Sequence, residues 1–203
     1  MDDGRKLKRT RAFFNLWATA YDYFPLILWL HSVQKKVLRI MDPPWKAAIL
    51  DIGTGTGSAI HMLIQRGHRG KLAGVDLSPR MLERARRKLG KRAELHLADV
   101  TKLPFKAGSF DIVMSTEAFH HFTRPEKATR EMARVLKKGG RLYVADVNFF
   151  FRPKAWLFEK VEPGCVHIYT GDEMRRLFEK AGLAVTTQRR LGLLAILTIG
   201  KKR

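Results

Sequence analysis

The hydrophobic and polar positions after residue 46 alternate between two patterns along the chain. Short apolar runs predict buried strands at 47–50, 72–75, 93–97, 110–115 and 141–146. Between these runs, stretches with helical spacing predict helices at 59–66, 79–89 and 125–136. Because parallel strands need crossover connections, this alternation predicts a parallel sheet with right-handed helical crossovers.

Proline and glycine positions agree with these boundaries. Pro79 and Pro125 stand where a first helical turn tolerates proline, and Gly139-Gly140 is a stop signal for the preceding helix. Toward the end of the chain, a helix is expected from about residue 172 to 181, followed by strands at 183–187 and 193–199. The short connection between those strands predicts an antiparallel hairpin at one edge of the sheet.

The first part of the chain differs in composition from the rest. It has a basic start, an aromatic-rich middle and a second basic cluster, and Pro43 and Pro44 then interrupt any helix. We therefore expect an N-terminal helical segment over 1–45 and one α/β domain over 46–203. The length suits a single domain with its own hydrophobic core.

A glycine-rich turn follows the first predicted strand. Its sequence is Asp51-Ile52-Gly53-Thr54-Gly55-Thr56-Gly57, and a predicted helix follows it directly. Open α/β sheets bind ligands at the carboxyl ends of their strands, where glycine lets the backbone approach the ligand. Asp76 ends the next strand, at the place where an acid accepts hydrogen bonds from the ribose of an adenosine cofactor.

Two cofactor classes share these features, and the charge within the turn separates them. The dinucleotide fingerprint requires glycine where this chain has Ser58, and an acid in that turn would repel a pyrophosphate. Asp51 is such an acid, and it would instead stabilise a cofactor that carries an ammonium and a sulfonium. Asp99, after the third strand, is expected to accept a hydrogen bond from an adenine amine. The pattern favours S-adenosylmethionine over a dinucleotide.

Six segments match a known pattern in the same order. They are 49–57, 74–82, 98–100 with 103–105, 109–113, 119–122 and 134–142. Over about residues 10–147 the chain thereby resembles the class I S-adenosylmethionine-dependent methyltransferases, and among them the ubiquinone/menaquinone-biosynthesis type. The resemblance implies an α/β fold with a doubly wound, Rossmann-like sheet of seven strands, mostly parallel with an antiparallel last strand.

The resemblance also implies roles for individual residues. The family's N-terminal helical lid, which folds over the cofactor, is similar to the segment from Asn15 to Asp22, with Ala18 and Tyr21. The expected cofactor-binding residues are Tyr21, Asp51, Gly53, Thr54, Gly55, Gly57, Asp76, Leu77, Met81, Asp99, Val100, Ser115 and Thr116. The chain departs from the pattern at Arg124, where many relatives have an acid, so the charge on the substrate side differs.

Methyl transfer from a sulfonium is an in-line displacement, so the protein mainly aligns the reactants and excludes water. His120 and His121 lie just beyond the fourth strand, and either is a candidate general base toward a phenol or enol. A structural or lid role for this pair stays open, and Glu117 is either a weaker base or a helix-start residue. The other histidines lack metal-ligand spacing, so no metal is expected.

The composition adds a large positive charge, with a formal net charge of +20 from 39 Lys+Arg against 19 Asp+Glu. This surplus suits nucleic acid, acidic substrates or an anionic membrane surface, and it also suits a merely solvated surface. The single cysteine, Cys165, excludes an internal disulfide and fits a reducing compartment. No apolar stretch approaches the about 20 residues of a membrane span, so a cytoplasmic location is expected.

Three functions remain after these observations. Aromatic residues between Phe13 and Trp29, and again at 149–151, favour a methyltransferase for a small apolar or ring-containing acceptor. The positive charge favours an RNA or protein methyltransferase, although no RNA-binding module is recognised and specific nucleic-acid binding is not expected. The third function is a cofactor-binding regulator without turnover.

The tetrad at 42–45, Asp-Pro-Pro-Trp, matches a motif of amine-directed nucleic-acid methyltransferases. It precedes the first predicted strand, whereas in those enzymes the motif follows the fourth.

Overall fold

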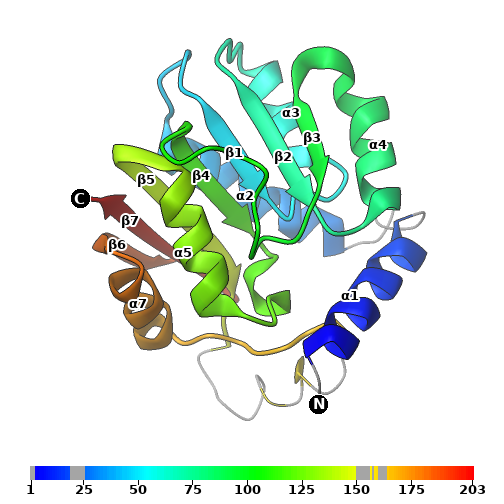
Figure 1. Ribbon diagram of the computed structural model, residues 1–203, viewed down its shortest axis with the longest axis vertical. Helices are drawn as coiled ribbons and strands as arrows, with labels where there is room; N and C mark the ends of the chain where they lie inside the picture. The colour runs from blue at the N-terminus through cyan, green and yellow to red at the C-terminus, as the bar shows by residue number, and fades with distance from the viewer. Residues whose placement is uncertain (1–2, 19–25, 150–155, 157, 160–163) are drawn as a thin grey trace.

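The computed structural model describes residues 3–18, 26–149, 156, 158, 159 and 164–203. Its centre is a seven-stranded sheet in the order β3-β2-β1-β4-β5-β7-β6 (Figure 1). The strands are β1 Ile49–Ile52, β2 Leu72–Asp76, β3 Glu94–Leu97, β4 Phe110–Thr116, β5 Leu136–Val147, β6 Leu183–Arg190 and β7 Ala195–Lys202. Strands β1 to β5 pair in parallel, whereas β7 pairs antiparallel with both β5 and β6. The predicted doubly wound α/β sheet is therefore confirmed.

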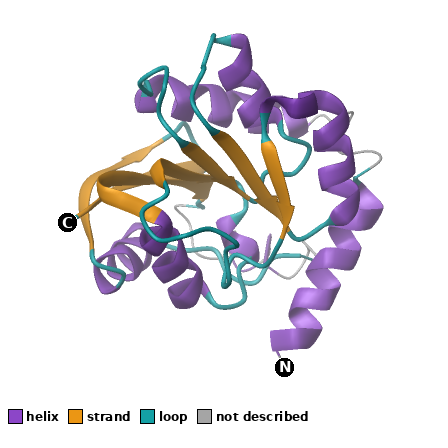
Figure 2. Ribbon diagram, turned by 45° about the horizontal axis from the view of Figure 1, so that its top comes forward, coloured by secondary structure: helices purple, strands orange, loops and turns teal. Residues whose placement is uncertain are grey.

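Helices cover both faces of this sheet (Figure 2). They are α1 Asp3–Trp17, α2 Leu26–Met41, α3 Ser58–Gln65, α4 Pro79–Leu89, α5 Pro125–Val135 and α7 Gly171–Lys180, with the short 3-10 helices η2 Gly90–Arg92 and η3 Phe119–His121. Local chemistry explains where they begin. Ser78 caps α4 by accepting a hydrogen bond from the Met81 amide, and Thr170 forms a capping box with Glu173 at α7.

The two larger hydrophobic cores among the described residues form because successive strand side chains point to opposite faces. Ile49 of β1 belongs to the core that β1 shares with α2 and α3, on one face. Leu50 and Ile52 belong to the core that includes α5 and α7, on the other face. The near-continuous apolar runs of the sequence therefore reflect strands that are buried on both sides.

The structure corrects the boundary between α5 and β5. The helix ends at Val135, and β5 begins at Leu136 instead of residue 141. Leu136 is fully buried and pairs with Phe110, and the register shifts between Phe110 and Ile112. The glycine pair expected to stop the helix lies instead inside this irregular part of the strand, where Gly139 adopts a left-handed φ of 77°.

The C-terminal hairpin forms as predicted, and its second strand lies inside the sheet. Strand β7 inserts between β5 and β6, so β6 is the edge strand. Helix α2 contributes Val33 and Val37 to the same core as β1, β5 and β7. The domain boundary expected at residue 45 stays a prediction. Among the described residues, no helix combines the length and the apolar character needed to cross a membrane.

Candidate functional site

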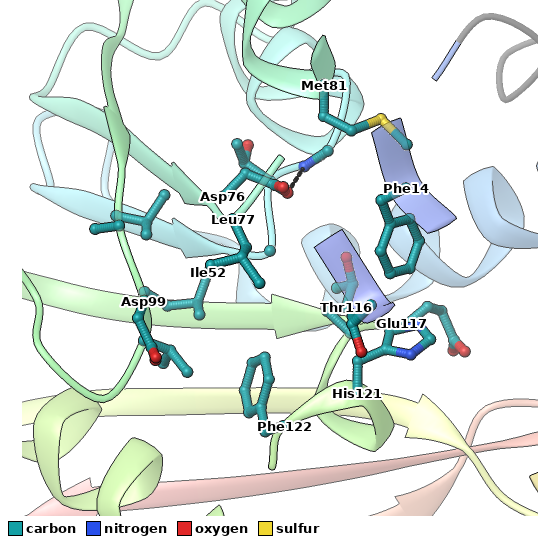
Figure 3. Close-up of a pocket in the computed structure, with 18 of the residues that line it drawn as sticks. Phe14, Ile52, Asp76, Leu77, Met81, Asp99, Thr116, Glu117, His121 and Phe122 are labelled. Atoms are coloured by element: carbon teal, nitrogen blue, oxygen red, sulfur yellow. Dashed lines mark hydrogen bonds between the residues drawn. The ribbon is translucent and has the colours of Figure 1, made fainter. Parts of the chain in front are cut away.

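A pocket lies at the carboxyl ends of the parallel strands, where the segments after β1, β2, β3 and β4 meet (Figure 3). Helices α1 and α2 contribute further walls. The lining comprises Leu7, Thr10, Phe14, Leu30, Gln34, Ile52, Gly53, Thr54, Gly55, Thr56, Ser58, Val75, Asp76, Leu77, Met81, Ala98, Asp99, Val100, Thr101, Thr116, Glu117, Ala118, His121, Phe122 and Thr123. In Figure 3, Asp76 and Asp99 lie toward one end, whereas Phe14, Glu117 and His121 lie toward the other.

The glycine turn after β1 is shaped by left-handed backbone conformations. Gly53 and Gly55 have φ values of 70° and 53°. Residues other than glycine adopt such angles only with backbone strain. A Cβ on Gly53 would lie 2.5 Å from the Cβ of Ala118, so a side chain does not fit there. The turn is tied to β2 because the amides of Gly53 and Thr54 both donate to the Val75 carbonyl, at 2.9 and 3.0 Å.

Asp51 lies in β1 just before the glycines of this turn and is only 2% exposed. Its Oδ2 accepts a hydrogen bond of 2.8 Å from the Thr54 hydroxyl. Its Oδ1 is buried and has no hydrogen-bond partner among the described residues. Burial raises the pKa of Asp51 to about 7, the Thr54 hydroxyl opposes this shift, and the charge of Asp76 adds to it. A cation bound above the turn would stabilise the ionised form of this carboxyl.

Asp76 ends β2 beside the turn. Its Oδ2 accepts a hydrogen bond of 2.8 Å from the Gly55 amide, which Figure 3 shows as a dashed line, and its Oδ1 accepts one from the Ser78 amide. Burial raises the pKa of Asp76, and these backbone amides oppose the shift. Asp99, after β3, accepts a hydrogen bond of 2.8 Å from the Thr101 amide. The three acids that end successive strands therefore meet at one edge of the sheet.

Helix α1 closes one side of the pocket and is tied to the start of α4. The Ser78 hydroxyl donates a hydrogen bond of 2.7 Å to the Asn15 side-chain oxygen. The Arg80 guanidinium donates to the backbone carbonyl of Asn15 at 3.3 Å. This contact places Phe14 and Thr10 in the pocket wall. Ser78 thus both caps α4 and holds the helix that covers the site.

The two histidines expected to be catalytic have different positions. His121 lines the pocket, and its ring packs edge-on against Phe14 with centroids 4.7 Å apart. Its Nδ1 is 2.8 Å from the Gly164 carbonyl oxygen, which can only accept, so Nδ1 carries the proton. Burial holds the pKa of His121 well below its usual value, with a further contribution from His120. The neutral ring therefore has its lone pair on Nε2.

His120 lies behind the pocket wall, buried against β5. Its Nδ1 donates a hydrogen bond of 2.7 Å to Oδ1 of Asp146, and both side chains are almost fully buried. The rings of His120 and His121 are in contact, with centroids 3.8 Å apart. His120 is therefore placed to hold His121 in position and does not face the pocket.

Glu117 occupies a strained position in the same wall. Its φ of 52° is in the left-handed region, which is uncommon for a residue other than glycine and is often found at functional sites. Its Oε1 is buried without a hydrogen-bond partner among the described residues. Burial raises the pKa of Glu117 well above its usual value, and the charge of Asp146 adds to the shift. Burial and the neighbouring Asp146 therefore favour the protonated form of this carboxyl.

Most of the expected cofactor residues come together in this pocket. Gly53, Thr54, Gly55, Asp76, Leu77, Met81, Asp99, Val100 and Thr116 line it, together with His121. Three other expected cofactor residues, Asp51, Gly57 and Ser115, do not belong to the lining, and neither does the catalytic candidate His120. Ser115 is fully buried. Tyr21 lies outside the described residues.

The sequence predicted an N-terminal lid but did not indicate four lining residues of α1 and α2. Leu7, Thr10, Leu30 and Gln34 line the pocket, and the Gln34 side-chain amide donates to the Thr116 hydroxyl at 3.4 Å. One signal was present in the sequence. Gln34 stands four residues from both Leu30 and Leu38, so a polar side chain interrupts the buried face of an amphipathic helix.

Comparison with known proteins identifies relatives of this chain. A family model described as a methyltransferase domain matches residues 50–144. Demethylmenaquinone methyltransferase of Thermus thermophilus is 43% identical over 101 residues, which cover 48% of this chain and 46% of that protein. The ubiquinone/menaquinone biosynthesis C-methyltransferase UbiE of Rhizobium meliloti is 31% identical over 188 residues, which cover 84% of this chain and 72% of that protein.

A solved structure agrees with these relatives. It contains a putative methyltransferase of Haloferax volcanii in complex with the Trm112 methyltransferase activator. The two chains are 25% identical with a TM-score of 0.82, and the match covers 93% of this chain and 96% of the other. With this fold, the strand-end acids and the sequence matches, the chain belongs to the class I S-adenosylmethionine-dependent methyltransferases and resembles their ubiquinone/menaquinone-biosynthesis members.

Proposed function

We propose that this chain transfers a methyl group from S-adenosylmethionine to a small acceptor that is apolar or contains a ring. The observation that carries the proposal is the continuity of the pocket. It joins the acidic end at Asp76 and Asp99 to walls formed by Phe14, Leu30 and Phe122. One cavity thus offers polar recognition for an adenosine cofactor and an apolar space for a second reactant.

The residues at the acidic end fit S-adenosylmethionine. The buried Oδ1 of Asp51 has no partner among the described residues, and it lies under a turn that suits a cationic methionine part. The space above Gly55 is open, since a Cβ built there meets no atom within 4 Å. Asp76 and Asp99 are hydrogen-bond acceptors for the ribose and adenine. When bound, the cofactor supplies an electrophilic methyl group on its sulfonium.

The opposite end of the pocket supports a role in accepting a proton. His121 is neutral because burial lowers its pKa, and its Nδ1–H is held by the Gly164 carbonyl. We propose that Nε2 of His121 takes the proton from the acceptor hydroxyl or carbon acid. His120, anchored on Asp146, then positions the ring of His121. The relatives named for quinone biosynthesis are consistent with an acceptor of this kind.

The nucleic-acid alternative receives no support from the Asp-Pro-Pro-Trp tetrad. Residues 42–45 connect α2 to β1, and none of them lines the pocket. The corresponding position after β4 holds Thr116, Glu117 and Ala118, which do line it. The positive surface still permits methylation of RNA or protein, and a regulator without turnover would have the same cofactor site. Both alternatives are decided by the same experiment as the proposal.

The cofactor assignment is tested by calorimetric titration with S-adenosylhomocysteine, with NADH as the control ligand. We expect binding of the first and none of the second. Asp76→Ala should weaken binding at least tenfold, because a charge-assisted hydrogen bond is worth about 1.5–3 kcal/mol. Glu83→Ala is the matched control, since it removes an equal charge from an exposed site on α4. Binding of NADH alone would overturn the assignment.

The acceptor class is tested with radiolabelled S-adenosylmethionine and separate pools of quinols, lipids, small acids, RNA and protein. Label in the quinol pool is the expected result. Label in RNA or protein alone would support the alternative of RNA or protein methylation. Tight cofactor binding without label in any pool would favour the regulator.

A further inference from the structure

The tip of the β6–β7 hairpin exposes apolar side chains that the methyltransferase site does not use. Leu193 is 87% exposed and Leu194 is 41% exposed, whereas the neighbouring Leu191 is buried at 4%. Large apolar side chains at the end of a loop, held away from the core, often mark an interaction surface.

The backbone of this tip is firmly held although its side chains are exposed. The Leu191 amide donates to the Ala195 carbonyl, and the Asn148 amide donates to the Leu194 carbonyl, both at 2.8 Å. Gly192 has a left-handed φ of 86°, which allows the chain to reverse. Leu191 is anchored in the same core as α2. The two exposed leucines are therefore presented by a defined turn.

Cations flank the tip that carries the two leucines. Arg189 and Arg190 end β6 immediately before the tip, and both are exposed. Lys36 of α2 is also exposed, and its Nζ comes within 3.6 Å of the Cβ position at Gly192. No acidic residue occurs between 189 and 195. Apolar side chains flanked by arginine and lysine match the chemistry of an anionic bilayer, where leucines enter the interface and cations meet phosphate groups.

The position of the tip relates it to the pocket. Ala195 begins β7 and pairs with Val147 at the carboxyl end of β5. The glycine turn and the acids of the pocket follow the carboxyl ends of β1 and β2, at the same edge of the sheet. Helix α2 joins the two regions, because it contributes Leu30 to the pocket and Lys36 to the surroundings of the tip.

We propose that the β6–β7 tip, Leu191 to Leu194, is a membrane-docking surface that inserts Leu193 and Leu194 into an anionic lipid bilayer. Arg189, Arg190 and Lys36 then lie at the level of the lipid phosphates. Docking in this way places the pocket edge of the sheet toward the membrane. The aromatic residues of α1 and α2 are less suited to this task, because Phe14 lines the pocket and Trp29 packs against the core.

The test uses the full chain and vesicles of phosphatidylcholine, with or without about one third phosphatidylglycerol. Co-sedimentation needs neither cofactor nor acceptor, so its outcome is independent of the proposed methyl transfer. We expect the wild-type chain to bind anionic vesicles far better than neutral ones. The double variant Leu193→Ser with Leu194→Ser should lower the partition coefficient at least tenfold, because a leucine buried in the interface contributes about that factor.

Two further variants make the result specific to the tip. Leu97→Ser is the matched control. Leu97 is 51% exposed on β3, the outermost strand farthest from β6, and its replacement should leave binding unchanged. Arg189→Gln with Arg190→Gln should weaken binding about fivefold per cation and reduce its salt dependence.

Three results would overturn the proposal. They are absence of binding to anionic vesicles, binding that the double leucine variant does not change, and an equal loss in Leu97→Ser. Circular dichroism of each variant separates a docking defect from unfolding. The second of these results would indicate that the charged surface alone attracts the membrane.

Discussion

At the residue scale, burial sets the protonation of the groups that line or support the pocket. Burial raises the pKa of Asp51 and Glu117 and lowers that of His121. Each shift disfavours the charged form, as desolvation requires. Before any ligand binds, the site therefore carries less charge near neutral pH than its residue types indicate.

Cofactor binding should release a proton from Asp51. Its pKa of about 7 means that the carboxyl is largely protonated below neutral pH. A bound cation favours the ionised form, so affinity for S-adenosylmethionine should rise as the pH increases toward 7 and then level off. Calorimetry at about pH 6 in buffers of different ionisation enthalpy measures the release. Asp51→Asn should reduce it, and an undiminished release in this variant would contradict the assignment.

His121→Ala should reduce turnover of the best acceptor by about a hundredfold, the usual contribution of a general base. The dissociation constant for S-adenosylhomocysteine should stay nearly unchanged, because His121 lies at the opposite end of the pocket from Asp76. In the wild type, the rate should fall only when the pH drops below the lowered pKa of His121, where the ring becomes charged. Steady-state kinetics across pH checks the rate and its pH dependence. His96→Ala, at a half-buried position on the edge strand β3 outside the pocket lining, is the control.

At the element scale, short connections and helix ends form the site. The glycine turn joins β1 to α3, and the start of α4 carries Ser78, which holds α1 over the pocket. The glycine turn can therefore be tested by its effect on stability, and the contact at Ser78 by its effect on the position of α1 over the pocket.

The turn is tested by a pair of glycines with similar backbone angles. Gly53 and Gly108 have φ values of 70° and 67°, but only a Cβ on Gly53 would clash with Ala118. Gly108→Ala should cost about 1–2 kcal/mol of unfolding free energy from backbone strain. Gly53→Ala should cost about 1–3 kcal/mol more from overpacking. Urea unfolding measures both, and equal losses would show that the contact with Ala118 is easily relieved.

Asn15→Ala tests the contact that holds α1. It removes the hydrogen bond from Ser78, whereas the bond from Arg80 reaches the backbone carbonyl and survives. The lost hydrogen bond contributes about 0.5–1.5 kcal/mol to holding α1 in place. Its removal should speed hydrogen exchange in α1 and weaken S-adenosylhomocysteine binding by a few fold. Ser78→Ala should also lower the melting temperature, because it removes the α4 cap. Unchanged exchange in Asn15→Ala would mean that other contacts hold α1.

At the scale of the whole molecule, the formal net charge of +20 acts over the entire surface. A field of this size attracts polyanions without base-specific contacts. The same surplus serves the membrane-docking surface. There, Leu193 and Leu194 add apolar contact with the lipid, which charge cannot provide. Charge and apolar contact can be separated by their different responses to salt.

Binding to a short single-stranded RNA should be nonspecific. We expect measurable affinity at low salt and a loss of at least about tenfold between 50 and 200 mM salt, because the interaction depends on release of counterions. Fluorescence anisotropy with two unrelated RNA sequences measures this. Sequence-selective binding that survives the higher salt would instead favour an RNA substrate.

The order of strands and helices was predictable because it depends on local patterns. The strand that ends at Asp76, the cap at Ser78 and the hairpin after residue 183 follow from periodicity and from residues that start or stop elements. The start of β5 was not predictable, because Leu136 is drawn into the sheet by its pairing with Phe110, a long-range contact. A local pattern holds no information about such pairings.

The sequence by itself determined the sheet type, the family and the acids that end the strands. Periodicity, glycine positions and charge are properties of short stretches of chain and do not depend on distant contacts. Only the tertiary structure decided which side chains meet in one cavity. Gln34 reached the pocket through the packing of α2, and His120 turned away from it toward Asp146. Burial, which sets the pKa values of Asp51 and His121, likewise exists only when distant segments pack together and exclude water.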